Sequence, residues 1–80
     1  MMLAQNMPTP NSNSRLVLTK RETECLQALA DGLDNAGIAK TLGIRVPTVA
    51  MHIANARRKL GALTRIQAVA KAVGTGLIHP

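Results

Sequence analysis

The sequence contains no phenylalanine, tyrosine or tryptophan among its 80 residues. RNA-binding and single-strand-binding modules usually stack bases on aromatic rings, so this absence argues against both classes. Cys25 is the only cysteine, which excludes an internal disulfide. Its place on the apolar side of an expected helix predicts a small buried side chain in a reducing compartment, with a redox switch as the alternative.

The chain also lacks the usual signals for membranes and for catalysis. It has neither a basic start followed by an apolar run nor about 18 consecutive apolar residues, so we expect a soluble cytoplasmic protein. No Ser/His/Asp set, phosphate-binding glycine loop or metal-ligand cluster is present in the sequence. We therefore expect that the protein is not an enzyme and binds no cofactor. His52 and the distant Cys25 cannot complete a zinc site.

Acidic residues are absent from the second part of the chain. Up to Asp34 there are three basic residues and four acids, a net charge of −1; the remainder has seven basic residues and no acid, a net charge of +7. Such a one-sided surplus attracts the phosphate backbone of nucleic acids. A solvated basic surface without a partner is the alternative.

Eighty residues allow one domain, which we place at residues 18–80, and leave no room for a sensory domain with a small-molecule ligand. Residues 1–17 contain two prolines and a run of Asn and Ser, which predicts a mobile tail. The first expected helix begins with a capping box of Thr19 and Glu22 and ends before Gly32. Its apolar stripe comprises Cys25, Leu26, Leu29 and Ala30.

Two further helices follow, separated by a short turn. Asp34 is expected to cap a helix that ends at Gly43 and buries Ile38, Ala39 and Leu42. The next helix is expected from about Pro47 to Leu60, with Gly61 as its stop. At about 100° per residue its inward stripe is Val49, Ile53, Ala56 and Leu60, and its outward side is Ala50, Met51, Ala54, Asn55 and Arg58.

A fourth helix is indicated by a second capping box, made by Thr64 and Gln67. We expect Ile66, Val69, Ala70 and Val73 to face inward. Ala68 and Ala72 would then lie outward, where two copies could approach closely, although alanines also suit a solvated helix surface. No period-two pattern competes, so the expected fold is all-α with four helices.

Several motifs now carry a family resemblance. L-T-x-R-E, I-A-x-x-L-G-I, T-V-x-x-H and R-K-L-G, in this order within residues 16–78, resemble the LuxR-type (GerE/FixJ-like) helix-turn-helix domain. The segment N-A-R-R-K-L-G-A is similar to the corresponding segment in the quorum-sensing branch of this family. The resemblance implies a dimeric transcription regulator that inserts its third helix into the major groove and pairs through its fourth, which would make Ala68 and Ala72 the dimer interface.

The resemblance also places DNA contacts on the outer side and at the ends of the third helix. Arg45 stands where the family usually has a capping Ser, and Ala50 and Ala54 stand where it often has Lys or Arg, which weakens base readout. Asn55 can pair with adenine and Arg58 with guanine. The expected DNA-contacting residues are Lys20, Arg45, Thr48, Ala50, Met51, Ala54, Asn55, Arg57, Arg58, Lys59 and Arg65.

Two functions fit these observations. The first is a transcription regulator that binds double-stranded DNA as a homodimer and has no sensory domain. The second is a homologue that forms a heterodimer with a full-length LuxR-type regulator and blocks it. Ala50 and Ala54 favour the antagonist, and the basic end of the third helix favours the DNA binder. The sequence leaves open the operator, the sign of regulation, and whether the chain is a natural short protein or a fragment.

Overall fold

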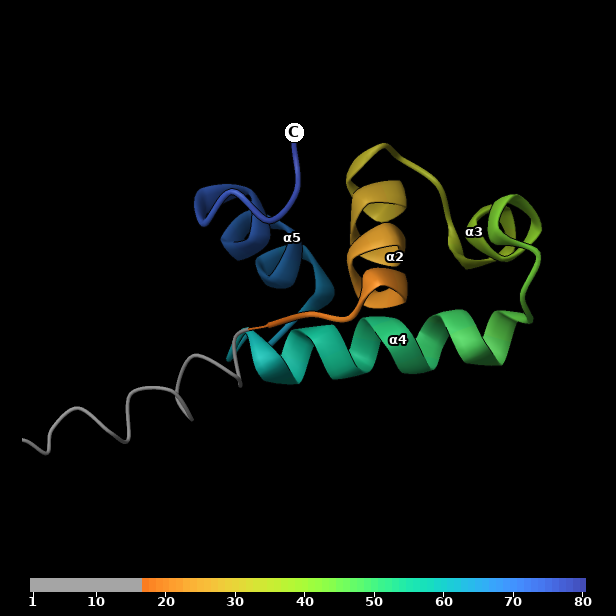
Figure 1. Cartoon of the computed structure of the whole chain (residues 1–80), viewed down its shortest axis with the longest axis horizontal. Coiled ribbons are helices and arrows are strands. Elements are labelled where there is room, and N and C mark those ends of the chain that lie inside the picture. Colours follow the sequence, from red (N-terminus) through yellow and green to blue (C-terminus); the bar gives the residue numbers. More distant parts are fainter. Residues whose placement is uncertain (1–16) are drawn as a thin grey trace, which may run out of the picture.

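The computed structural model describes residues 17–80, and these residues form four helices without a strand (Figure 1). The helices are α2 (Lys20–Ala30), α3 (Asn35–Leu42), α4 (Val46–Lys59) and α5 (Arg65–Gly74). The expected all-α fold with four helices is confirmed. The expected mobile tail, apart from Val17, lies outside the described residues.

Helix α2 begins with the capping box that the sequence predicts. The Glu22 backbone N–H donates to Thr19 Oγ1 at 3.1 Å, and the Thr19 N–H donates in return to Glu22 Oε1 at 2.9 Å. These two bonds satisfy donors that the first turn of a helix otherwise leaves unpaired. Past the helix end, Gly32 adopts a φ of 100°, a backbone conformation in which a side chain is unfavourable.

Helices α3 and α4 form a helix-turn-helix. Asp34 caps α3, because its Oδ1 accepts the Gly37 N–H at 2.8 Å. Gly43 ends that helix in the left-handed conformation, with a φ of 70°. Only residues 43–45 separate the two helices, so the direction of α4 is set by this short turn.

The inward stripe of α4 is buried as predicted, and it joins two clusters of core side chains. Val49 and Ile53 pack with Cys25 and Ile38 between α2, α3 and α4. Ala56 and Leu60 belong to a second cluster, whose other buried members are Leu18, Leu26, Ala62, Ala68, Ala72 and Ile78. Helix α4 thus runs along one side of the whole domain, with the other three helices on the opposite side of it (Figure 1).

The predicted orientation of α5 is wrong. Ala68 and Ala72 are fully buried in the core, whereas Ile66 is 79% exposed and Ala70 is also exposed. Two alanines one turn apart let the backbone of α5 lie close to α2 and α4, so the small side chains occupy the inner face. Ala68 and Ala72 are therefore inside the folded chain and cannot form the dimer interface expected for them.

The start of α5 also differs from the expectation. Thr64 Oγ1 accepts the Gln67 N–H at 3.0 Å, which is the first half of a capping box. The Gln67 side chain, however, accepts the Leu63 N–H at 2.8 Å instead of the Thr64 N–H. The predicted second capping box is thus half formed, and the glutamine side chain instead bonds Leu63, the residue before the cap.

The C-terminal residues complete the core in a way that no sequence pattern indicated. Ile78 is 2% exposed and packs in the cluster of α2, α4 and α5. The side-chain amide of Gln27 on α2 donates to the His79 carbonyl and accepts the His79 N–H, both at 2.9 Å. This pair of bonds holds the end of the chain against α2.

Candidate nucleic-acid interface

The outer side of α4 is not covered by any other helix of the described chain (Figure 1). Ala50 and Arg58 are exposed there, and Met51 is 50% exposed, as predicted. Ala54 and Asn55 are half-buried on the same helix. A straight helix of 14 residues with one free side has the shape that fits a DNA major groove.

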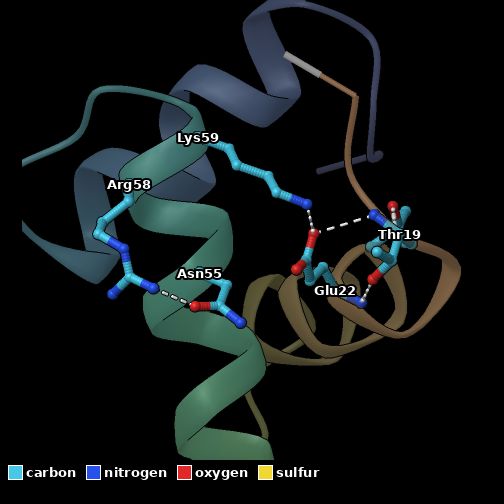
Figure 2. A network of polar contacts seen from close by, with 6 residues as sticks. Thr19, Glu22, Asn55, Arg58 and Lys59 are labelled. Carbon is cyan, nitrogen blue, oxygen red and sulfur yellow. Dashed lines mark hydrogen bonds and ion pairs between the residues drawn. The ribbon is translucent and has the colours of Figure 1, made fainter. Parts of the chain in front are cut away.

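The two polar side chains expected to read bases contact each other. Arg58 Nη2 donates a hydrogen bond to Asn55 Oδ1, one helical turn away (Figure 2). The bond joins positions i and i+3, which face the same side of a helix. Asn55 and Arg58 are therefore a connected pair on α4.

Lys59 forms an ion pair with a buried carboxylate. Its Nζ lies 2.9 Å from Oε1 of Glu22, which is 3% exposed, and the same oxygen accepts the Thr19 N–H (Figure 2). Burial by itself raises the pKa of Glu22. The hydrogen bond and positive charge of Lys59, together with the hydrogen bonds of Thr19, outweigh this effect and lower the pKa below its ordinary value. The last turn of α4 is thereby tied to the cap of α2.

Other basic side chains of the expected interface are also hydrogen-bonded within the chain. Arg57 Nη1 donates to the Ala62 carbonyl at 3.0 Å, which stabilises the loop after α4. Arg65 Nη2 donates to Asn35 Oδ1 at 2.9 Å and links the start of α5 to the start of α3. Both guanidinium groups keep further donors that can face a phosphate.

Lys20 and Arg45 lie at the starts of α2 and α4, and both are exposed. Among the described residues neither side chain makes a hydrogen bond or ion pair, and Arg45 supplies no side-chain cap to α4. The helix dipole disfavours a cation at either position. These charges are therefore available to an anion outside the protein, and the half-buried Thr48 lies one turn from Arg45.

The remaining chemistry of residues 17–80 is sparse. No group of three or more His, Cys, Asp and Glu side chains in this range could hold a metal ion. Cys25 is buried as predicted, and burial raises the pKa of its thiol. None of the four described helices is long and apolar enough to span a bilayer.

Comparison with known proteins agrees with this geometry. The profile of the family "Bacterial regulatory proteins, luxR family" matches residues 16–72. The transcriptional activator protein LuxR of Aliivibrio fischeri (strain ATCC 700601 / ES114) is 39% identical over 75 residues, which are 94% of this chain and 30% of that protein. The nitrate/nitrite response regulator NarP of Escherichia coli (strain K12) is 48% identical over 52 residues, 65% of this chain and 24% of NarP. The chain thus spans less than a third of the length of these relatives.

Two solved structures are similar as well. The transcription factor GerE superposes with a TM-score of 0.74 at 36% identity, covering 76% of this chain and 91% of GerE. The Vibrio cholerae VqmA dimer, studied as an example of LuxR-type receptors, gives a TM-score of 0.76 at 30% identity, covering 100% of this chain and 40% of VqmA.

Proposed function

Because this chain belongs to the LuxR family of bacterial regulatory proteins, we propose that it binds double-stranded DNA and regulates transcription in the cytoplasm. The observation that supports this most directly is the uncovered outer side of α4, which follows α3 after a turn of three residues. In a helix-turn-helix the second helix enters the major groove in this way. The net charge of +7 after Asp34 supplies the attraction to phosphate.

The contacts fall into two groups. We propose that Arg58 reads guanine, and that Ala50, Met51 and Ala54 offer only apolar contact, for instance to a thymine methyl group. The phosphate contacts come from side chains around the ends of α4 and at the starts of its neighbours, namely Lys20, Arg45, Thr48, Arg57 and Arg65. Lys59 contributes less than these, because Glu22 already neutralises its charge.

We further propose that the chain acts as a homodimer through the exposed side of α5. Ile66 is 79% exposed and Leu63 is 81% exposed, and the exposed Ala70 lies one turn after Ile66. This small apolar surface replaces Ala68 and Ala72 as the proposed contact. Two-fold pairing would set the two copies of α4 about one DNA turn apart on a near-palindromic site.

A second function is favoured by the composition of the outer side of α4. Ala50 and Ala54 carry no polar group for a base, and Lys59 is paired with Glu22. A chain with so few readers fits an antagonist that uses the exposed side of α5 to form a heterodimer with a full-length LuxR-type regulator. Both proposals use the same fold but differ in whether the chain alone selects a DNA sequence.

Selection of binders from a random pool of duplex DNA at moderate salt separates the two functions. A regulator enriches a near-palindromic sequence, whereas an antagonist enriches none and instead removes a LuxR-type regulator from its DNA. Ala50→Glu and Ala70→Glu are matched variants, because each places one negative charge at an exposed helix position. Ala50→Glu should abolish binding even to a half-site, and Ala70→Glu should abolish only cooperative binding to paired half-sites. Equal effects of the two variants would contradict the assignment of the two surfaces.

A further inference from the structure

The three consecutive basic residues at the end of α4 have different surroundings. Arg57 donates to the Ala62 carbonyl, and Lys59 is paired with the buried Glu22. Arg58 alone is exposed on the uncovered side of α4. Of this basic triplet, Arg58 is therefore the residue whose guanidinium can enter the groove without breaking a contact to another part of the fold.

The one described partner of the Arg58 side chain is Asn55, whose Oδ1 accepts from Arg58 Nη2. Reading adenine with an asparagine needs both ends of the amide, since the oxygen accepts from the base and the nitrogen donates to it. The bond to Arg58 occupies one of the two lone pairs of Asn55 Oδ1, so a bidentate contact to adenine would have to share this oxygen with Arg58. Arg58 loses one of five N–H donors in the same bond and keeps enough for a bidentate contact to guanine.

We propose that Asn55 is a positioning residue that holds the Arg58 guanidinium for guanine and does not itself read a base. The inference rests on the proposed DNA binding of α4. Arginine has many rotamers, and a half-buried acceptor one turn away restricts them before DNA is bound. Sequence preference at one base pair then depends on two side chains, of which only Arg58 touches DNA.

The test measures base preference at each position in a random duplex pool for the full chain and for variants. Arg58→Ala should lower the preference for guanine at one base pair by about 5- to 100-fold. Asn55→Ala should lower the preference at that same base pair by a smaller factor, about 3- to 10-fold, and add nothing in the Arg58→Ala background. Asn55→Asp keeps the acceptor for Arg58 but cannot donate to adenine, so it should retain the guanine preference although its charge weakens binding to all sequences alike.

Asn35→Ala is the matched control, because Asn35 Oδ1 also accepts from an arginine, Arg65. Asn35 begins α3, which lies on the other side of α4 from its uncovered side (Figure 1). Asn35→Ala should leave base preference unchanged, and circular dichroism verifies that every variant is helical. The proposal is overturned if Asn55→Ala and Asn55→Asp both change the preference at a base pair other than the one that Arg58→Ala affects. It is also overturned if Asn55→Ala changes the preference at no base pair. If the unaltered chain binds all sequences alike, the proposed readout itself fails; if it selects a sequence but Asn55 behaves otherwise than expected, only the positioning role fails.

Discussion

The ion pair between Lys59 and Glu22 gives the sharpest prediction about stability. In Lys59→Met the charge is removed while most of the aliphatic stem is kept, so the change isolates the loss of the ammonium group. Glu22 is then left as a buried carboxylate that retains only the N–H of Thr19 and its own capping role. We expect the variant to fold but to be less stable than the unaltered chain.

The size of the effect follows from the exposure of the two side chains, which is 33% for Lys59 and 4% for Glu22. Removing one partner of a fully buried pair costs about 3–5 kcal/mol, whereas exposed pairs contribute about 0–1 kcal/mol. With the lysine a third exposed and a backbone donor still on Glu22, we expect a loss of about 1–3 kcal/mol. For a domain of this size each kcal/mol lowers Tm by about 4–8 °C.

The pH dependence of this loss has a defined sign. The pKa of folded Glu22 is lowered from its ordinary value of 4.5, so its contribution to stability is full above that pH and is lost as pH falls through the lowered pKa. In Lys59→Met the lowering by Lys59 is lost while that by Thr19 remains, so the pKa of Glu22 should be higher than in the unaltered chain. The difference in stability between the two proteins should therefore be largest near neutral pH and shrink below 4.5.

Thermal and urea unfolding followed by circular dichroism measure the change. Lys40→Met is the matched control, because Lys40 is exposed on α3 and should change stability by no more than about 0.5 kcal/mol. The double variant Lys59→Met with Glu22→Gln should cost less than the sum of the single changes, since no buried charge is left unpaired. A Lys59→Met protein as stable as Lys40→Met at neutral pH would refute this account of the ion pair.

Three other predictions follow from burial and charge. Ala68→Glu should destabilise the fold by about 3 kcal/mol or more, because it puts an unpaired carboxylate into a fully buried position. An unchanged Tm would contradict the burial of this side of α5. Lys20→Ala and Arg45→Ala should each lower the slope of log affinity for DNA against log salt concentration by about 1 per protomer. Lys59→Met should change this slope less, and equal changes in all three variants would mean that Glu22 does not withhold Lys59 from phosphate. Cys25 should react with a thiol reagent only after unfolding, since it is buried and its pKa is raised, and rapid labelling of the native protein would show that the site opens.

The sequence by itself determined the elements that depend on local chemistry. Thr19 with Glu22 and Asp34 with its neighbours mark helix starts, because a cap is made by residues three positions apart. The inward stripe of α4 is also readable, because large aliphatic residues recur along one side and its ends are marked by Pro47 and Gly61. From these signals the four helices, the helix-turn-helix and the outer side of α4 follow.

Only the tertiary structure decided which side of α5 is buried. Val69 and Val73 are half-buried and border both candidate faces, so side-chain size alone does not choose between Ile66 and Ala68. The choice depends on how closely α5 approaches α2 and α4 and on Ile78, which fills part of the same core. Closeness of approach is a property of the assembled helices and has no periodic signal along the chain.

The fold likewise decided the different partners of the three basic residues Arg57, Arg58 and Lys59. Lys59 meets Glu22 across 37 positions of sequence, and no spacing rule joins residues so far apart. Arg58 keeps a partner within its own helix, a contact that sequence spacing permits but does not require. Local chemistry therefore predicted where the positive charge lies, and the packing of α2 against α4 determined that Lys59 is paired within the described chain.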